Sequence, residues 1–450
     1  MKLVCLSCTS HTLRLKTPNP KFGSKEALLF LQNCANLKQL KQIHGKIIRF
    51  GHSHDQLLLR KVLHLSSSYG DMYYASLVFN QIKAPDTFTC NVMIRAYTIS
   101  GSHEQALHIF KLMSCQGPTP DKFTFPFVIN TCLLASCALL DFGKLVHALA
   151  IKMGFSSDIY LQNTLMNLYF KCENTECGCK VFDKMLVRSV ASWTTMISGL
   201  AACGQLDEAR RIFEQMPCKN VVSWTAMIDG YVKNQQPIEA FRLFQRMQLE
   251  NVMPNEFTLV SLIKACTEMG SLKLGKWVHD FALKNGFNLG IFMGTALIDM
   301  YSKCGSLEDA MRVFHKMPTK GLATWNSMIT SLGVHGMGNE ALGCLQEMEN
   351  TNVAPDAITF VGVLNACVHI NDLEKAEKYF NLMTEHYGIA PVMEHYECMI
   401  ELYSRVNRLD EIYSRVKTNC SMVLELIQER KASNGVDGNK FEFTAGLMEA

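Results

Sequence analysis

The residues whose types and spacing most suggest chemistry are His395 and Glu397, which form a His-x-Glu triplet. In zinc deaminases this triplet is followed by Pro-Cys-x-x-Cys, because one histidine and two thiolates hold the zinc while the glutamate moves protons. Here Cys398 and Cys420 follow without such a pair. The sequence therefore predicts no catalytic site at this place, and we expect the chain not to be an enzyme.

The cysteines offer two further groups of potential metal ligands. Cys5 and Cys8 lie near the start of the chain, and Cys172, Cys177 and Cys179 lie close together further along. Neither group is joined by a second set of ligands at the spacing of a zinc site. The sequence also lacks a phosphate-binding glycine loop and a nucleophile motif. We therefore expect no metal ion and no cofactor.

Composition restricts the classes of protein to consider. A chain of 450 residues is too long for one compact core, and 48% hydrophobic with 19% charged residues is typical of a folded protein. The net charge of +3 gives no support for polyanion binding, so a nucleic acid would have to be held by locally placed cations. The 18 cysteines lie mostly in apolar stretches and are expected to be reduced and buried. The longest apolar run, 127–140, is too short to cross a bilayer, so we expect no membrane association.

The elements that carry these residues recur with a period. Trp193 and Trp224 are 31 residues apart, and Trp325 follows 101 residues later. A ladder of alanines and a ladder of methionines share these spacings: Ala209, Ala240, Ala310 and Ala341, and Met113, Met185, Met216, Met247, Met317 and Met348. Three ladders with common spacings indicate a repeat protein.

Each period predicts two amphipathic helices. Trp224, Met227, Ile228 and Tyr231 have helical spacing in a first helix, and an apolar stripe over 206–216 indicates a second. The repeated alanine fits the point where the two helices cross. Because one such hairpin cannot bury both faces, neighbouring hairpins must stack into a solenoid. Three histidines recur in the second helix of long repeats, which indicates packing rather than catalysis: His44, His147 and His279.

We place each repeat boundary after the polar residue that ends a repeat, which gives lengths of 31 to 37 residues. The repeats are 56–86, 87–121, 122–158, 159–189, 190–220, 221–255, 256–290, 291–321, 322–356 and 357–392. Degenerate repeats precede this array at about 24–55 and follow it from Met393. The sequence thus predicts an all-α, right-handed α-solenoid of about twelve helix-turn-helix repeats over 24–420, followed by a polar tail, 421–450.

Several segments carry a family signature. Asn-Glu-Phe-Thr at 255–258 leads to Lys-Ala-Cys at 264–266 and Leu-Gly-Lys-Trp-Val-His at 274–279, and 296–305 follows in the next repeat. With these segments the chain resembles plant pentatricopeptide-repeat proteins of the subclass that alternates standard, long and short repeats, over about residues 24–415. Tetratricopeptide repeats keep a single 34-residue period and fit less well. The family's deaminase domain is not recognisable after about Cys420.

The resemblance implies that each repeat reads one RNA base through two side chains. We call the fifth and the last residue of a repeat its reading pair. By resemblance the pairs are Asn91 with Asp121 and Asn326 with Asp356 for uracil, Asn163 with Ser189 for cytosine, Thr194 with Asn220 and Thr225 with Asn255 for adenine, and Thr295 with Gly321 for a purine. The long repeats carry Pro126 with Asp158 and Val260 with Gly290, and are interpreted as spacers or protein-binding repeats. Taken one at a time, each polar residue could equally be an ordinary exposed helix residue.

Two further columns of residues fit contacts with RNA. Apolar or aromatic second residues of repeats would stack on bases, although packing between repeats is the alternative: Phe88, Tyr160, Val222 and Phe292. Cations at the thirteenth residue would contact phosphates, although a solvated side chain is the alternative: Lys171, Lys233, Lys303 and Arg405.

The composition of the N-terminus predicts targeting to an organelle. Residues 1–25 are basic and rich in serine and threonine, and no acidic residue precedes Glu26. This composition is typical of a transit peptide, which we assign to residues 1–23, with a frayed terminus as the alternative. Arg14 is the single arginine of this segment, which favours a chloroplast over a mitochondrion.

Together the resemblance and the reading pairs predict a sequence-specific single-stranded RNA-binding factor. C-to-U editing or another RNA modification is the expected process, with the chain recognising the site and a trans-acting deaminase or other RNA-processing protein supplying the chemistry. Splicing and RNA stabilisation stay open. A monomeric chain and single-stranded organelle RNA as its partner are expected. The alternative is a helical scaffold that binds proteins and never contacts RNA.

Overall fold

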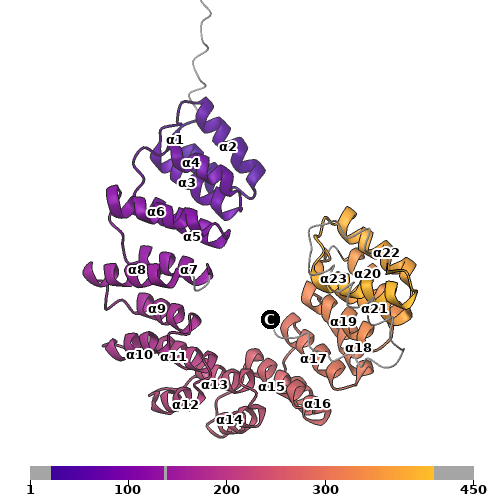
Figure 1. The fold of residues 1–450 in the computed structure, drawn as a ribbon. Coiled ribbons are helices and arrows are strands. Elements are labelled where there is room, and N and C mark those ends of the chain that lie inside the picture. Colours follow the sequence, from indigo (N-terminus) through magenta and orange to yellow (C-terminus); the bar gives the residue numbers. More distant parts are fainter. Residues whose placement is uncertain (1–21, 136–138, 352, 410–450) are drawn as a thin grey trace, which may run out of the picture. The chain divides into compact units, whose positions relative to one another are not determined.

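The computed structural model describes residues 22–135, 139–351 and 353–409. Within these residues the chain forms the α-helices α1 to α23 and one π-helical turn, η2, and no strand (Figure 1). The predicted all-α repeat solenoid is therefore confirmed. The predicted tail and all but the last two residues of the predicted transit segment lie outside the described residues.

Contacts divide the chain into an N-terminal unit, Met1–Cys218, and a C-terminal unit, Lys219–Ala450. The helices of the N-terminal unit are α1 (Ser24–Gln32), α2 (Leu37–Arg49), α3 (Gln56–Ser68), α4 (Met72–Gln81), α5 (Thr87–Ile99), α6 (His103–Gln116), α7 (Thr124–Leu134), α8 (Leu140–Lys152), α9 (Ile159–Lys171), α10 (Thr175–Lys184), α11 (Val190–Ala202) and α12 (Leu206–Gln215). Odd-numbered helices are the first helices of repeats, and even-numbered helices are the second.

The C-terminal unit continues the same alternation. Its helices are α13 (Val221–Lys233), α14 (Pro237–Leu249), α15 (Glu256–Glu268), α16 (Leu272–Lys284), α17 (Ile291–Lys303), α18 (Leu307–Lys316), α19 (Leu322–Val334), α20 (Gly338–Asn350), α21 (Ala357–Ile370), α22 (Leu373–Asn381), η2 (Leu382–His386) and α23 (Met393–Arg405). Within each unit, first helices pack on the first helices of neighbouring repeats, and each second helix packs on the first helix of its own repeat (Figure 1).

The ladders found in the sequence form the core. The four ladder alanines are fully buried between the two helices of their repeats. Trp325 of α19 packs edge-on against Phe314 of α18, with ring centroids 5.0 Å apart. Trp193 of α11 packs in the same way against Phe182 of α10, at 5.1 Å. Trp193 and Trp325 therefore each join their repeat to the one before it.

Two glycines mark places where helices approach closely. A Cβ atom on Gly143 of α8 would lie 2.6 Å from Leu168 Cδ2 of the next repeat, and one on Gly275 of α16 would lie 2.3 Å from Met300 Sδ. Both glycines occupy the fourth position of the second helix of a long repeat. Larger residues would push the following repeat away, so the spacing of the stack depends on them.

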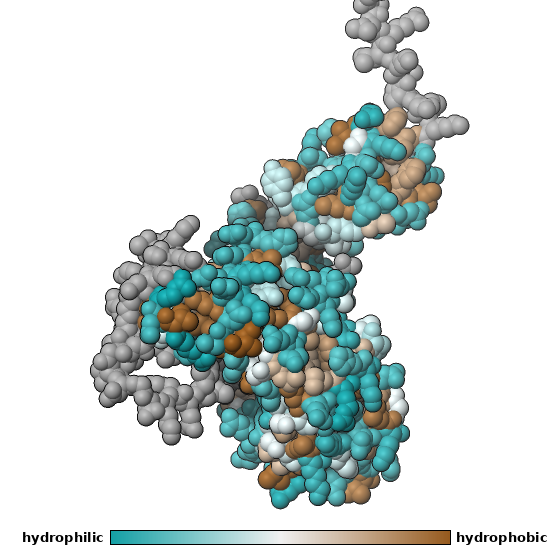
Figure 2. Space-filling view, turned by 90° about the vertical axis from the view of Figure 1, so that its right-hand side faces the viewer, coloured by the Kyte–Doolittle hydropathy of each residue, from teal (hydrophilic) through white to brown (hydrophobic). Residues whose placement is uncertain are grey.

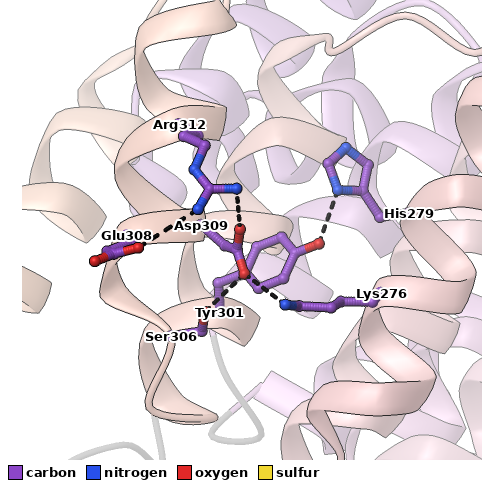
Figure 3. A network of polar contacts seen from close by, with 7 residues as sticks. All are labelled: Lys276, His279, Tyr301, Ser306, Glu308, Asp309 and Arg312. Atoms are coloured by element: carbon purple, nitrogen blue, oxygen red, sulfur yellow. Dashed lines mark hydrogen bonds and ion pairs between the residues drawn. The ribbon is translucent and has the colours of Figure 1, made fainter.

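A polar network ties long repeat 256–290 to short repeat 291–321 (Figure 3). Asp309 lies 2.9 Å from Lys276 and 2.9 Å from Arg312, and it accepts a hydrogen bond from Ser306. The hydrogen bond to the Lys276 ammonium is the main reason why the pKa of Asp309 lies below its ordinary value. Beside this cluster His279 Nδ1 is 2.9 Å from Tyr301 Oη.

The other two recurring histidines make the same contact. His44 and His147 are hydrogen-bonded to Tyr74 and Tyr169, at 2.6 and 2.9 Å. Burial lowers the pKa of all three imidazoles, because burial disfavours the charged ring. These histidines therefore hold neighbouring helices together.

The described first helices begin where the predicted repeats begin, with one exception. Helix α7 begins at Thr124, two residues after the predicted boundary at Lys122. The cause is Pro126, which has no N–H to donate to the carbonyl of Lys122, so the first turn is not closed as an α-helix.

Most of the surface seen in Figure 2 is hydrophilic, with apolar residues in separate patches. Among the described residues, no helix has the length and apolar character needed to span a membrane.

Candidate nucleic-acid interface

In two repeats the reading pair is already hydrogen-bonded. Asn91 Nδ2 of α5 donates to Asp121 Oδ1 at 3.0 Å, and Asn326 Nδ2 of α19 donates to Asp356 Oδ1 at 3.0 Å. One pair lies in the N-terminal unit and the other in the C-terminal unit. In both repeats, therefore, two residues that lie 30 positions apart in the sequence, and that the repeat register pairs, contact each other with the same geometry.

In five of the six reading pairs the last residue has a second role at the start of the next first helix: Ser189, Asn220, Asn255 and Asp356 are N-caps, and Asp121 holds the turn that leads into α7. Asp121, Ser189, Asn220, Asn255 and Asp356 all accept a hydrogen bond from the backbone N–H three residues further on. An N-cap side chain satisfies a helix N–H group that would otherwise have no acceptor. The fold of one repeat therefore fixes the position of a reading residue for the repeat before it.

In two other repeats the reading pair is joined through a third side chain. Thr225 Oγ1 of α13 lies 2.7 Å from Thr258 Oγ1, and Thr258 Oγ1 lies 2.9 Å from Asn255 Oδ1. Thr295 Oγ1 likewise lies 2.8 Å from Thr324 Oγ1, which accepts a hydrogen bond from the backbone N–H of Gly321. These two repeats use a relay of hydroxyl groups in place of a direct contact.

The intermediate hydroxyl belongs to the third residue of the following repeat, which the sequence reasoning did not select. In repeat 322–356 the equivalent residue, Thr359, donates to Asn326 Oδ1 at 2.6 Å and also contacts Asp356. The available signal was a serine or threonine three residues after each capping residue, which is the spacing of a capping box. We call this column the third-position hydroxyls; its members are Thr124, Ser192, Ser223, Thr258, Thr324 and Thr359.

The remaining two reading pairs are less constrained. Asn163 of α9 and Ser189 are not hydrogen-bonded to each other in the described chain, and Asn163 Oδ1 is buried without a partner there. Thr194 of α11 donates to the carbonyl of Val190 at 2.9 Å. Its partner Asn220 belongs to the other unit, so the pair Thr194–Asn220 stays a prediction.

The carboxyl group of Asp121 is held in its charged form. Its partial burial raises the pKa, but hydrogen bonds from Thr124, Asn91 and Phe123 favour the charged form and together outweigh burial, so the pKa lies below its ordinary value. A charged carboxylate can only accept hydrogen bonds, so a group that hydrogen-bonds to Asp121 must be a donor.

The predicted stacking residues are all exposed at the first turns of first helices: Phe88, Tyr160, Val222 and Phe292. Phe292 also lies 6.2 Å from Phe257, which is the second residue of the preceding long repeat. Exposure makes these side chains accessible to a base, and their role in stacking stays a prediction.

The predicted phosphate-binding cations are exposed but already engaged. Lys233 Nζ lies 2.9 Å from Asp229, Lys303 Nζ lies 3.3 Å from Asp299, and Arg405 Nε lies 3.1 Å from Glu401. Each acid stands four residues before its cation. Exposed pairs of this kind are worth at most about 1 kcal/mol, so a phosphate could displace the acid at low cost. The fourth cation of this column is Lys171, at the end of α9.

The His-x-Glu triplet is part of the helical framework. His395 is buried at the start of α23, accepts a hydrogen bond from the backbone N–H of Val392 and contacts the carbonyl oxygen of Ala357. Burial raises the pKa of the neighbouring Cys398 thiol to about 12. No group of three or more potential metal ligands occurs among the described residues.

Family models match these repeats. The model of the PPR repeat family matches residues 85–133, 219–268 and 321–369. The model of the single PPR repeat matches residues 163–190, 191–221, 295–322 and 358–387.

Whole-chain relatives extend this similarity. A chloroplastic pentatricopeptide repeat-containing protein of Arabidopsis thaliana is 55% identical over 432 residues, covering 96% of this chain and 92% of its own length. A second, named as chloroplastic or mitochondrial, is 35% identical over 86% of this chain and 57% of its own length. The crystal structure of the maize pentatricopeptide repeat protein PPR10 has a TM-score of 0.50 and 17% identity, covering 90% of this chain and 67% of that one.

Proposed function

The chain belongs to the pentatricopeptide-repeat family, and from this premise we propose that it binds one defined stretch of single-stranded RNA. Repeats of this family read one base each through two or three side chains. Proteins of this kind act as RNA-binding helical repeats and not as enzymes.

The observation that carries the proposal is the preformed contact in the Asn91–Asp121 and Asn326–Asp356 pairs. A packing residue needs no partner chosen by repeat register, whereas a reading residue does. Phe88, the second residue of repeat 87–121, and Phe292, the second residue of the repeat before 322–356, are exposed apolar side chains on which a base could stack.

The process we propose is C-to-U editing in the chloroplast, with this chain recognising the site and a deaminase acting in trans. The mixed 31- and 35-residue repeats resemble the subclass associated with editing. The chloroplast is favoured by the N-terminal composition and by the name of the 55% identical relative. Splicing or stabilisation of the same transcript would use the same RNA contacts.

The test is a binding series with one octamer and its single-base variants. The family binds RNA with the 5′ end toward the N-terminus, so repeats 87–121 to 322–356 predict U, any, C, A, A, any, purine, U. We expect wild-type protein to lose roughly tenfold in affinity when a specified base is changed, as one lost base contact implies. Equal binding of every variant at moderate salt would favour the protein-binding scaffold instead.

A cation variant separates affinity from specificity. Lys233→Ala should weaken binding to all variants alike and reduce the salt slope by about one counterion, since a phosphate contact carries no base information. A base-dependent effect of Lys233→Ala would contradict the assigned register.

A further inference from the structure

Repeat 56–86 carries an unusual side chain at the fifth position. Where the next repeat has Asn91, this one has Arg60, in helix α3. Arg60 Nη1 lies 2.9 Å from Asp86 Oδ2, and Asp86 is the last residue of the same repeat. The two residues therefore meet at the same register positions as Asn91 and Asp121.

The carboxylate of Asp86 has the same double role as that of Asp121. Its other oxygen, Oδ1, accepts a hydrogen bond from the backbone N–H of Thr89 at 3.0 Å and so caps helix α5. Because the cap fixes Asp86, the direction from which Arg60 approaches is fixed as well. Sequence reasoning passed over this repeat because it looked for small amides and hydroxyls at the fifth position.

Arg60 keeps most of its hydrogen-bonding capacity unused. A guanidinium has five N–H donors. In the described chain its contact is with Asp86 alone, and its Nε is buried without a partner. An unpaired buried donor costs free energy, whereas the side chain as a whole is 33% exposed, so its remaining N–H groups can reach an acceptor outside the protein.

Apolar side chains border the pair. Leu57 and Phe88 are the second residues of repeats 56–86 and 87–121, and they are 58% and 59% exposed. They occupy the column that we assign to base stacking. Further along the first helices, the cations Lys61 and Arg95 lie close enough to His64 to help burial lower the pKa of that imidazole. A polyanion that follows the first helices would therefore meet positive charge here.

We propose, resting on the proposed function, that repeat 56–86 binds a ninth nucleotide, on the 5′ side of the octamer, and that the Arg60–Asp86 pair selects guanine. The guanidinium donates to O6 and N7 of guanine, and Asp86 Oδ2, the oxygen that Thr89 does not use, accepts from N1–H. Uracil offers one acceptor and one donor to the same pair and binds less well. Adenine and cytosine present an amino group to the guanidinium and are rejected.

The experiment compares four nonamers, the octamer preceded by G, U, A or C, on the full chain. Wild-type protein should bind the 5′-G nonamer about tenfold more tightly than the 5′-A nonamer. Arg60→Asn recreates the Asn–Asp pair of repeat 87–121 and should move the preference from G to U. Arg60→Lys keeps the charge and the ion pair but loses the planar fork, so it should fold normally and lose the preference for G over U.

The outcomes separate this inference from the function on which it rests. If single-base changes within the octamer alter affinity but the four nonamers bind equally, the inference is overturned and the proposed function stands. If Arg60→Asn leaves a preference for G, the pair is not the reading element and the inference is again overturned. If the octamer variants also bind equally, the proposed function fails, and the inference fails with it.

Discussion

Repeats 221–255 and 322–356 of the C-terminal unit connect their reading pairs with different chemistry. In repeat 322–356 the amide of Asn326 donates to Asp356 and accepts from Thr359, so each of its polar atoms has one assigned role. In repeat 221–255 the hydroxyl of Thr225 lies close to both the carbonyl of Val221 and the hydroxyl of Thr258.

The hydroxyl relay cannot satisfy all its contacts at once. Thr225 and Thr258 have one hydroxyl hydrogen each, while the contacts with Val221, between the two threonines and with Asn255 require three. One contact always lacks a hydrogen, so the relay can present either a donor or an acceptor to a base. If these pairs read bases as proposed, the amide of Asn326 presents a fixed donor and acceptor to a base, whereas the hydroxyl of Thr225 can turn to suit the base.

The largest expected effect comes from converting one kind of repeat into the other. Thr225→Asn together with Asn255→Asp should give repeat 221–255 the direct pair of repeat 322–356. The preference at the fifth base of the octamer should change from adenine to uracil, by roughly 2 kcal/mol or thirtyfold, because one base contact is lost and another is gained. Equilibrium binding to the two octamers measures this.

The fourth base provides the internal control, because Thr194 and Asn220 are unchanged in the double variant. Its adenine preference should persist. If the fifth base also keeps its adenine preference, the direct pair does not set specificity and the comparison fails.

The next effect concerns stability. Asp356→Ala removes the N-cap of α21 and the acceptor for Asn326, so the free energy of unfolding should fall by about 1 kcal/mol in urea. Asp356→Asn keeps a capping oxygen and should lose much less. Asn255→Ala should resemble Asp356→Ala, because capping is common to both repeats; a clear difference between them would show that the reading contact itself adds stability.

A smaller effect distinguishes the two third-position hydroxyls. Thr258→Val breaks the relay and should reduce discrimination of the fifth base about threefold, as expected for one neutral hydrogen bond. Thr359→Val leaves the direct contact between Asn326 and Asp356 and should change discrimination of the eighth base less. Both variants lose the same hydroxyl in the capping box, so any difference in binding reports the relay. Equal losses would mean that Thr258 acts through the cap alone.

The smallest effect is a dependence on pH that only an Asn–Asp repeat should have. The pKa of Asp121 in the folded chain lies below its ordinary value of 3.8, so the unfolded chain binds protons first as the pH falls. The stability contributed by this carboxylate is complete above pH 3.8 and is lost as the pH falls through the folded pKa. The free energies of unfolding of wild type and Asp121→Asn, measured from pH 7 to 3, should therefore converge at the acidic end. Asn255→Ser changes a site without a titrating group, so its free energy of unfolding should differ from that of wild type by the same amount at every pH. A constant difference for Asp121→Asn would contradict this.

The fold could be predicted in detail because its signals are periodic and local. The ladder residues indicated the repeat length, and a polar residue before most first helices marked their start, as Asp158 does for α9 and Asn255 for α15. The start of α7 was missed because the register was extended from neighbouring repeats without allowing for the missing N–H of Pro126.

The candidate interface was only partly predictable. Register identified which residues pair, as for Asn326 and Asp356, but it could not show that Thr359 joins them, since a buried threonine in a first turn reads as packing. The acids beside the cations, such as Asp229 four residues before Lys233, have the spacing of helical ion pairs and are recognisable in the sequence. Register also pairs Arg60 with Asp86, but an arginine at the fifth position does not fit the small amide or hydroxyl expected there, so its ion pair is evident only from the structure.

The capping role of the last residue bears on how such a protein changes its target during evolution. Asp, Asn, Ser, Thr and Gly are the residues that favour an N-cap position, and the set includes the last residues of all six proposed reading pairs. If the pairs read bases as proposed, a point substitution among these residues would change the base that one repeat selects, while the next helix would still begin at the same residue. Retargeting is therefore open to selection one nucleotide at a time, with little risk that an intermediate fails to fold.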